Sequence, residues 1–113
     1  MGWTKARLLA YCGDWYPDIL DHNGPACYEI GTGGPRGGYL QWHYVGETVN
    51  EKIRLATYAR SGSHLAEAIQ EHLDDGWHIF YRACACPTKG AAKKMQDSLL
   101  AKHKYDWNKV GNG

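Results

Sequence analysis

A glycine-rich break between two strand-forming segments is the feature that most constrains how this chain folds. The stretch Gly33-Gly34-Pro35-Arg36-Gly37-Gly38 separates the segments 27–32 and 39–45, and both segments are rich in aromatic and β-branched residues. A phosphate-binding loop would end in Lys-Ser or Lys-Thr and lead into a helix, and this break does neither. We therefore expect a β-hairpin with a long, glycine-rich tip.

The remaining pattern predicts three helices and one further strand. The helices are expected at residues 50–60, 63–75 and 88–103, and the strand at 77–84. Ser63 and Thr88 are the predicted N-caps of the second and third helices, and Gly76 ends the second. The residues predicted to share one side of the first helix are Ile53, Ala56 and Thr57.

The resulting element order, β-β-α-α-β-α, predicts an α+β fold. Its centre is a small three-stranded, mostly antiparallel sheet flanked by helices. Because 113 residues suffice for one domain and are too few for two, residues 1–113 are expected to form a single domain. Residues 1–25 mix aromatic residues with turn formers, and we expect them to be an extension packed on the core. Within them, residues 7–11 could form a short strand or a turn of helix.

Charge gives little guidance about the partner. The chain has 13 basic and 12 acidic residues and a net charge of +1, so a nucleic-acid partner would need a local basic face. Arg36 at the predicted hairpin tip and Lys93 and Lys94 on the third helix are the candidate phosphate contacts. A solvated surface explains these side chains slightly better than phosphate binding does.

The cysteines point to a reduced compartment. The N-terminus lacks the apolar segment of a secretory signal, and no stretch approaches transmembrane length, so a cytoplasmic location with buried thiols is expected. Cys84 and Cys86 share one side of a strand, where a mutual disulfide has poor geometry. A zinc site that combines them with His22 or Cys27 is an alternative, although the spacing differs from the usual Cys-x-x-Cys.

Two strand tyrosines are followed by an arginine and a third tyrosine. Tyr28 ends Ala26-Cys27-Tyr28 on the first strand, and Tyr44 begins Tyr44-Val45-Gly46 on the second. Arg54 and Tyr58 stand four positions apart on the next helix, so their side chains can reach the same site. This order resembles the GIY-YIG nuclease family, which is named for Gly-Ile-Tyr and Tyr-Ile-Gly on adjacent strands. Only the tyrosine of the first motif is kept here, and the second is nearly intact.

The third predicted helix extends the resemblance to roughly residues 26–108. Family members carry a glutamate three positions before a Leu-Leu pair, and an asparagine after an aromatic-rich turn. Gln96 and Asn108 occupy those two places in this chain. His64 stands where some relatives have a histidine, although a surface histidine that flanks the second helix is at least as simple an interpretation.

The resemblance implies a divalent-metal-dependent DNA endonuclease that hydrolyses phosphodiester bonds. It makes Tyr28 the general base or the group that orients the attacking water, and Tyr44 a ligand of the nucleophile or of a phosphate oxygen. Arg54 would hold the scissile phosphate, because its guanidinium is permanently charged and forked. Tyr58 would be a further phosphate or proton contact, and Asn108 would fix local structure near the site.

Gln96 is the departure from the family pattern. The glutamine amide keeps the shape of glutamate and loses its charge, so Mg²⁺ or Mn²⁺ is expected to bind weakly or not at all. An engineered inactivating change and a natural, catalytically silent relative both explain it, and the isosteric exchange favours the first. Glu47 could replace the missing ligand, whereas Asp97 is turned about 100° around the helix.

The sequence therefore supports two main hypotheses. The first is a DNA endonuclease that is inactive or weakly active because Gln96 replaces the metal-binding glutamate. The second is a non-catalytic DNA-binding module of the same fold. DNA is the expected partner in both, no membrane is involved, and the chain is expected to be a monomer or a homodimer.

Overall fold

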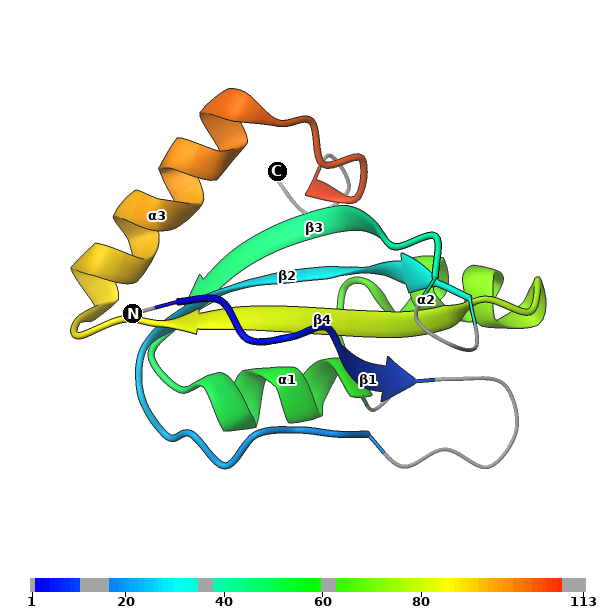
Figure 1. The fold of residues 1–113 in the computed structure, drawn as a ribbon, viewed down its shortest axis with the longest axis horizontal. Helices are drawn as coiled ribbons and strands as arrows, with labels where there is room; N and C mark the ends of the chain where they lie inside the picture. The colour runs from blue at the N-terminus through cyan, green and yellow to red at the C-terminus, as the bar shows by residue number, and fades with distance from the viewer. Residues whose placement is uncertain (1, 11–16, 35–37, 60–62, 109–113) are drawn as a thin grey trace.

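The structure is a computed structural model that describes residues 2–10, 17–34, 38–59 and 63–108. It has an α+β fold in which helices cover both faces of an antiparallel sheet, as the sequence predicted (Figure 1). The elements in chain order are β1 (Arg7–Ala10), β2 (Ala26–Gly33), β3 (Gln41–Thr48), α1 (Glu51–Ala59), α2 (Ala66–Asp74), β4 (His78–Ala85) and α3 (Lys89–Lys102).

The sheet has four strands in the order β1-β4-β2-β3, where three were expected. The additional strand, β1, comes from the N-terminal segment and pairs with β4, so this part of the predicted extension belongs to the sheet itself. Leu9 and Ala10 are buried there, which explains why the segment joins the sheet edge. A strand of four residues shows too little alternation for its sequence to distinguish it from a helical turn.

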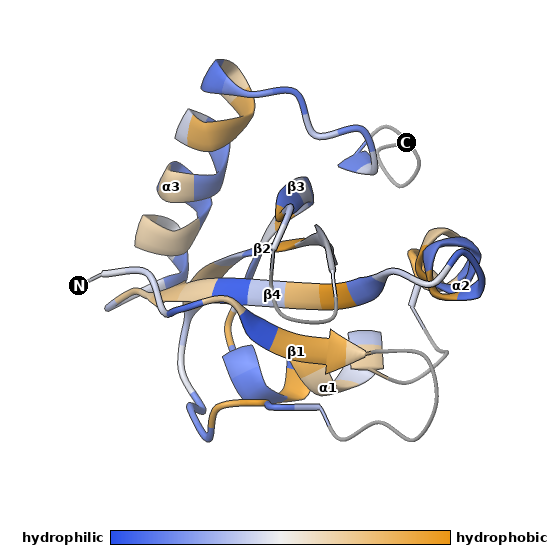
Figure 2. Cartoon of the chain, turned by 45° about the vertical axis from the view of Figure 1, so that its right-hand side comes forward, coloured by the Kyte–Doolittle hydropathy of each residue, from blue (hydrophilic) through white to orange (hydrophobic). Residues whose placement is uncertain are grey.

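The two faces of the sheet carry separate cores. Tyr28 and Ile30 on β2 lie in a core with residues of α1 and α2, which we call the α1-side core. Cys27 on the same strand lies in a second core with Val45 of β3 and Tyr105, against which Met95 and Leu99 of α3 pack; we call it the α3-side core. Because neighbouring side chains of a strand point to opposite faces, α1 and α3 cover opposite faces of the sheet (Figures 1 and 2).

The helix ends confirm one predicted cap and correct another. Thr88 Oγ1 accepts a hydrogen bond from the Ala91 amide at 3.0 Å, which confirms Thr88 as the cap of α3. Ser63 does not cap α2, because that helix begins at Ala66 and its N-cap position is Leu65. Ser63 Oγ instead accepts from the Leu65 amide at 3.2 Å, in a turn that precedes the helix.

The buried side of α1 differs from the predicted one. Ile53 is 64% exposed, whereas Leu55 and Tyr58 are buried in the α1-side core. The inner side therefore runs through Leu55 and Tyr58, and this rotation leaves Arg54 exposed at the surface. Asn50 fixes the start of the helix, since its Oδ1 accepts from the Ile53 amide at 3.0 Å.

The segment after α3 returns along the free edge of β3. The Trp107 amide donates to the His43 carbonyl at 2.9 Å. The Asn108 side chain accepts from the Val45 amide at 2.9 Å and donates to the Val45 carbonyl at 3.0 Å. His43 is the extra residue of a bulge, because Ile30 pairs with Tyr44 and Gly31 pairs with Trp42. The edge that carries Tyr44 is therefore covered from His43 to Val45.

Candidate functional site

Three of the predicted site residues come together on the α1 side of the sheet. The Tyr28 and Tyr58 hydroxyl oxygens are 2.8 Å apart, and both side chains are buried. The Tyr44 ring lies 6.2 Å from the Tyr28 ring and 6.1 Å from the Tyr58 ring, centroid to centroid. Strands β2 and β3 and helix α1 thus bring the three phenol rings into one group, which we call the tyrosine group.

His64 and Arg54 border the tyrosine group at the surface. The exposed His64 ring packs edge-on against Tyr44 and Tyr58, with centroid distances of 5.4 and 6.1 Å. Arg54 lies close enough for its positive charge to act on Tyr28 and Tyr44, where it partly opposes the rise in pKa that burial causes. Of the five residues, Arg54 and His64 are the exposed ones, so an approaching ligand meets an arginine, a histidine and the partly buried Tyr44 ring.

Tyr28 and Tyr44 remain protonated in this environment. Burial is the largest influence on Tyr28 and raises its pKa far above the ordinary value of 10, and the neighbouring Tyr58 and Tyr44 phenols raise it further. Burial likewise raises the pKa of Tyr44 well above 10. Arg54 opposes both shifts without cancelling either of them. At neutral pH, Tyr28 and Tyr44 therefore offer hydroxyl hydrogen bonds and no phenolate.

Gly46, the last residue of the Tyr-x-Gly motif, makes room for the Tyr28 ring. Gly46 and Tyr28 are paired directly across β2 and β3. A Cβ atom on Gly46 would lie 2.5 Å from the Tyr28 hydroxyl oxygen, 2.6 Å from Tyr28 Cζ and 3.0 Å from Tyr44 Cε2. Any side chain at position 46 would therefore displace one or both tyrosines.

Gln96 does not join the tyrosine group in this structure. It lies half-buried on α3, whose apolar residues Met95 and Leu99 pack against the α3-side core. Within the described part of the chain, its side chain makes no hydrogen bond. Helix α3 covers the face of the sheet opposite to α1, so the elements do not by themselves direct Gln96 toward Tyr28 and Tyr58.

The residues present do not fit the divalent metal that the family resemblance implies. Gln96 offers a neutral amide, and the described residues hold no group of three or more His, Cys, Asp or Glu that could bind a metal ion. Glu47 has a buried Oε2 without a hydrogen-bond partner, yet its charge acts on the Cys27 thiol of the α3-side core. Glu47 therefore faces away from the tyrosine group and is a poor replacement for the missing carboxylate.

The described residues also hold no cluster that could form the zinc site of the alternative interpretation. Cys27, Cys84 and Cys86 are free and buried. Burial is the largest influence on Cys27 and raises the pKa of its thiol to about 12. These cysteines behave as core residues and not as thiolate ligands.

The candidate DNA contacts lie apart from the tyrosine group. Lys93 and Lys94 are exposed on α3, and Lys93 Nζ lies 3.5 Å from an oxygen of Asp97, one turn further along the helix. Arg36 lies outside the described residues. The Asn108 side chain is hydrogen-bonded to the backbone of Val45, next to Tyr44. Because Asn108 is buried, a substrate could not contact it directly.

One polar group was not foreseen from the sequence. Glu29, in the middle of the fully buried strand β2, accepts hydrogen bonds from Arg82 Nε and from the Tyr105 hydroxyl, both at 2.5 Å. The sequence did contain a signal, which was a glutamate within a mostly apolar strand. A charge buried in this way requires a partner. This group lies on the α3 side of the sheet, away from the tyrosine group.

A comparison with known families finds one match, which lies in the second half of the chain. The pattern of the GIY-YIG domain-containing protein family matches residues 67–113, which include α2, β4, α3 and Asn108. This match supports a GIY-YIG family domain in the chain, and such a domain suggests a nuclease-type function. The matched part contains Gln96 but not the tyrosine group.

A curated relative adds a second finding. The chain is 38% identical over 71 residues to the Arabidopsis thaliana protein named "Protein EFFECTOR OF TRANSCRIPTION 3", and the match covers 62% of this chain and 26% of that protein. The chain thus spans about a quarter of the length of this relative. No solved structure matches the chain significantly. Among the described helices, none is long and apolar enough to cross a membrane.

Proposed function

We propose that this domain binds DNA at the tyrosine group, and that it is a metal-dependent DNA endonuclease in which Gln96 disables hydrolysis. The observation that carries the proposal is the convergence of Tyr28, Tyr44 and Tyr58 beside an exposed arginine. These four residue types, on these elements, are the ones that the nuclease family uses to hold a phosphodiester.

Arg54 supplies the charge for the phosphate. Its guanidinium is exposed and unpaired with any carboxylate among the described residues. It lies close enough to Tyr28 and Tyr44 to oppose part of the rise in pKa that burial causes. A free, forked cation beside hydroxyl donors suits the two unesterified oxygens of a phosphodiester. The neighbouring Tyr44 hydroxyl and His64 ring add hydrogen-bond donors beside it.

The protonated state of Tyr28 bears on the chemistry. With its pKa raised by burial, Tyr28 cannot take a proton from water near neutral pH. In the free domain its hydroxyl is hydrogen-bonded to that of Tyr58, and the base function that the family resemblance implies would need a nearby metal ion. Together with the neutral Gln96 amide, this supports a chain that binds DNA and leaves the phosphodiester intact.

The second candidate is a non-catalytic DNA-binding module, in which position 96 has no catalytic role. The similarity to a plant protein named as an effector of transcription favours it, because such a name does not require DNA cleavage. The position of α3 across the sheet from the tyrosine group also favours it. The two candidates share the DNA-binding surface and differ only in the effect of restoring a glutamate at position 96.

DNA binding is tested by fluorescence anisotropy with short duplex, branched and single-stranded DNA at several salt concentrations. We expect salt-sensitive binding, with Arg54→Ala reducing affinity about tenfold and the salt slope by about 1. Lys52→Ala is the matched control, because Lys52 lies on the same helix and is already paired with Asp21 at 2.9 Å. Equal affinities for Arg54→Ala and the unchanged chain would remove the tyrosine group as the DNA site.

A further inference from the structure

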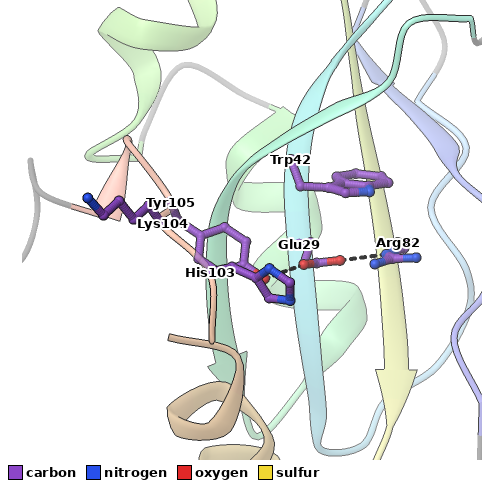
Figure 3. Close-up of a pocket in the computed structure, with 6 residues that line it drawn as sticks. All are labelled: Glu29, Trp42, Arg82, His103, Lys104 and Tyr105. Atoms are coloured by element: carbon purple, nitrogen blue, oxygen red, sulfur yellow. Dashed lines mark hydrogen bonds and ion pairs between the residues drawn. The ribbon is translucent and has the colours of Figure 1, made fainter. Parts of the chain in front are cut away.

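A polar cavity of about 290 Å³ opens on the α3 side of the sheet, opposite to the tyrosine group. It is lined by Glu29, Trp42, Arg82, His103, Lys104 and Tyr105. Figure 3 shows Glu29 between Tyr105 and Arg82, with the Trp42 ring beside Arg82. The volume falls near the lower end of the roughly 300–1,000 Å³ typical of small-molecule sites.

The Arg82 guanidinium is held by several contacts in this cavity. It lies over two indole rings, 4.7 Å from the Trp3 centroid and 5.1 Å from the Trp42 centroid. Its Nε donates to Glu29 Oε1, and its side chain is 34% exposed. The two terminal nitrogens of Arg82 have no partner among the described residues, so they remain available as donors in a fixed orientation.

Glu29 places an acceptor next to these donors. Each of its oxygens accepts one hydrogen bond, from Arg82 or from the Tyr105 hydroxyl, and each keeps a second lone pair. A bare phosphate has acceptor oxygens only and would meet the carboxylate with like charge. The floor of the cavity instead matches a ligand that presents N–H donors and acceptors side by side.

Two aromatic rings and a lysine also line the cavity. The flat rings of Trp42 and His103 line the cavity, and aromatic rings of this kind stack on nucleobases. The exposed Lys104 lies among the lining residues and supplies a cation for a phosphate attached to the base. Because Arg82 balances the charge of Glu29, Lys104 leaves the cavity with a net positive charge.

We propose that this cavity binds an unpaired nucleobase, guanine above the others, with its phosphate at Lys104. Guanine carries adjacent N–H donors for Glu29 and the acceptors O6 and N7 for Arg82. The site lies on the other face of the sheet from Arg54 and the tyrosine group. It would therefore allow the domain to hold an extruded or single-stranded nucleotide apart from its backbone-binding surface.

The test is calorimetric titration of the full chain with 5′-GMP and, in parallel, with ribose 5-phosphate and inorganic phosphate. GMP is expected to bind at least about tenfold more tightly than either base-free ligand, because stacking on Trp42 is worth about 1–3 kcal/mol. GMP should also shift the NMR signal of the Trp42 indole N–H. Equal affinity for GMP and ribose 5-phosphate, or an unmoved Trp42 signal at saturation, would overturn the proposal.

Substitutions of two exposed lysines test whether the phosphate of the ligand binds at this cavity. Lys104→Glu should weaken GMP binding about tenfold and leave guanosine binding unchanged, since guanosine lacks the phosphate. Lys102→Ala, also exposed but outside the cavity, should change neither. Arg54→Ala should leave GMP binding intact, so a failure of the DNA-binding proposal is distinguishable from a failure here. Loss of guanosine binding in Lys104→Glu would contradict the assignment of Lys104 to the phosphate.

Discussion

The Tyr28 hydroxyl oxygen lies 2.8 Å from that of Tyr58, a contact that joins the central strand β2 to helix α1 inside the α1-side core. Each hydroxyl is the hydrogen-bond partner of the other in a region that excludes water. The bond links α1 to the sheet. Arg54 stands one turn before Tyr58 on the same helix and is exposed.

Tyr58→Phe should destabilise the fold by about 1–3 kcal/mol. It removes the partner of Tyr28 and leaves a buried hydroxyl unsatisfied. The double substitution Tyr28→Phe/Tyr58→Phe should cost less than the sum of the two single changes, because it removes both hydroxyls together. Urea denaturation of the three variants measures this coupling. Additive costs would mean that the two hydroxyls do not depend on each other.

Gly46→Ala should disturb the tyrosine group. The new Cβ would lie 2.5 Å from the Tyr28 hydroxyl oxygen, so we expect a loss of about 1–3 kcal/mol and weaker DNA binding. Gly38→Ala is the control, since a Cβ at Gly38 meets nothing within 4 Å. Thermal denaturation compares the two variants, and an unchanged melting temperature for Gly46→Ala would contradict the close packing of Tyr28.

Glu51 should make stability depend on pH. Its Oε2 is buried without a hydrogen-bond partner, and burial raises its pKa above the ordinary 4.5, against the opposing charges of His22 and Arg7. The folded chain therefore holds the proton more tightly than the unfolded chain. The stability that Glu51 contributes is fully present below pH 4.5 and is lost as the pH rises through the folded pKa.

Glu51→Gln should accordingly raise the melting temperature at pH 7 and have a smaller effect at pH 4. Glu67→Gln is the matched control, because Glu67 also lies in the first turn of a helix but is exposed. Melting curves at both pH values measure the difference. A lower melting temperature for Glu51→Gln at pH 7 would show that His22 and Arg7 outweigh the cost of burial.

The sequence predicted those parts of the structure that depend on neighbouring residues. The hairpin, the Thr88 cap and the end of α2 at Gly76, where φ is 90°, each follow from local chemistry. Strand β1 was left open between a short strand and a turn of helix, because its four residues join the sheet only through their pairing with β4. The side of α1 predicted from the sequence was wrong, because Leu55 and Tyr58 are the residues that pack in the α1-side core.

The candidate site was also predictable only where it depends on neighbouring residues. Arg54 and Tyr58 are one turn apart on the same helix, so the closeness of the two residues could be predicted from their spacing. The placement of α3 against Cys27 and Val45 depends on which face of the sheet it covers, and no short motif carries that information. The partnership of Glu29 with Arg82 joins two strands that are far apart in the chain, and the sequence indicated only that Glu29 needed a partner.

The most direct test of a disabled endonuclease is a cleavage assay of Gln96→Glu on duplex, branched and single-stranded DNA with Mg²⁺ or Mn²⁺. The account predicts no cleavage by the chain as it stands, and metal-dependent cleavage by Gln96→Glu that is abolished when Arg54→Ala or Tyr28→Phe is added. If Gln96→Glu binds DNA and leaves all three forms uncut with either metal, the domain is not a disabled endonuclease, and the non-catalytic DNA-binding module stands in its place.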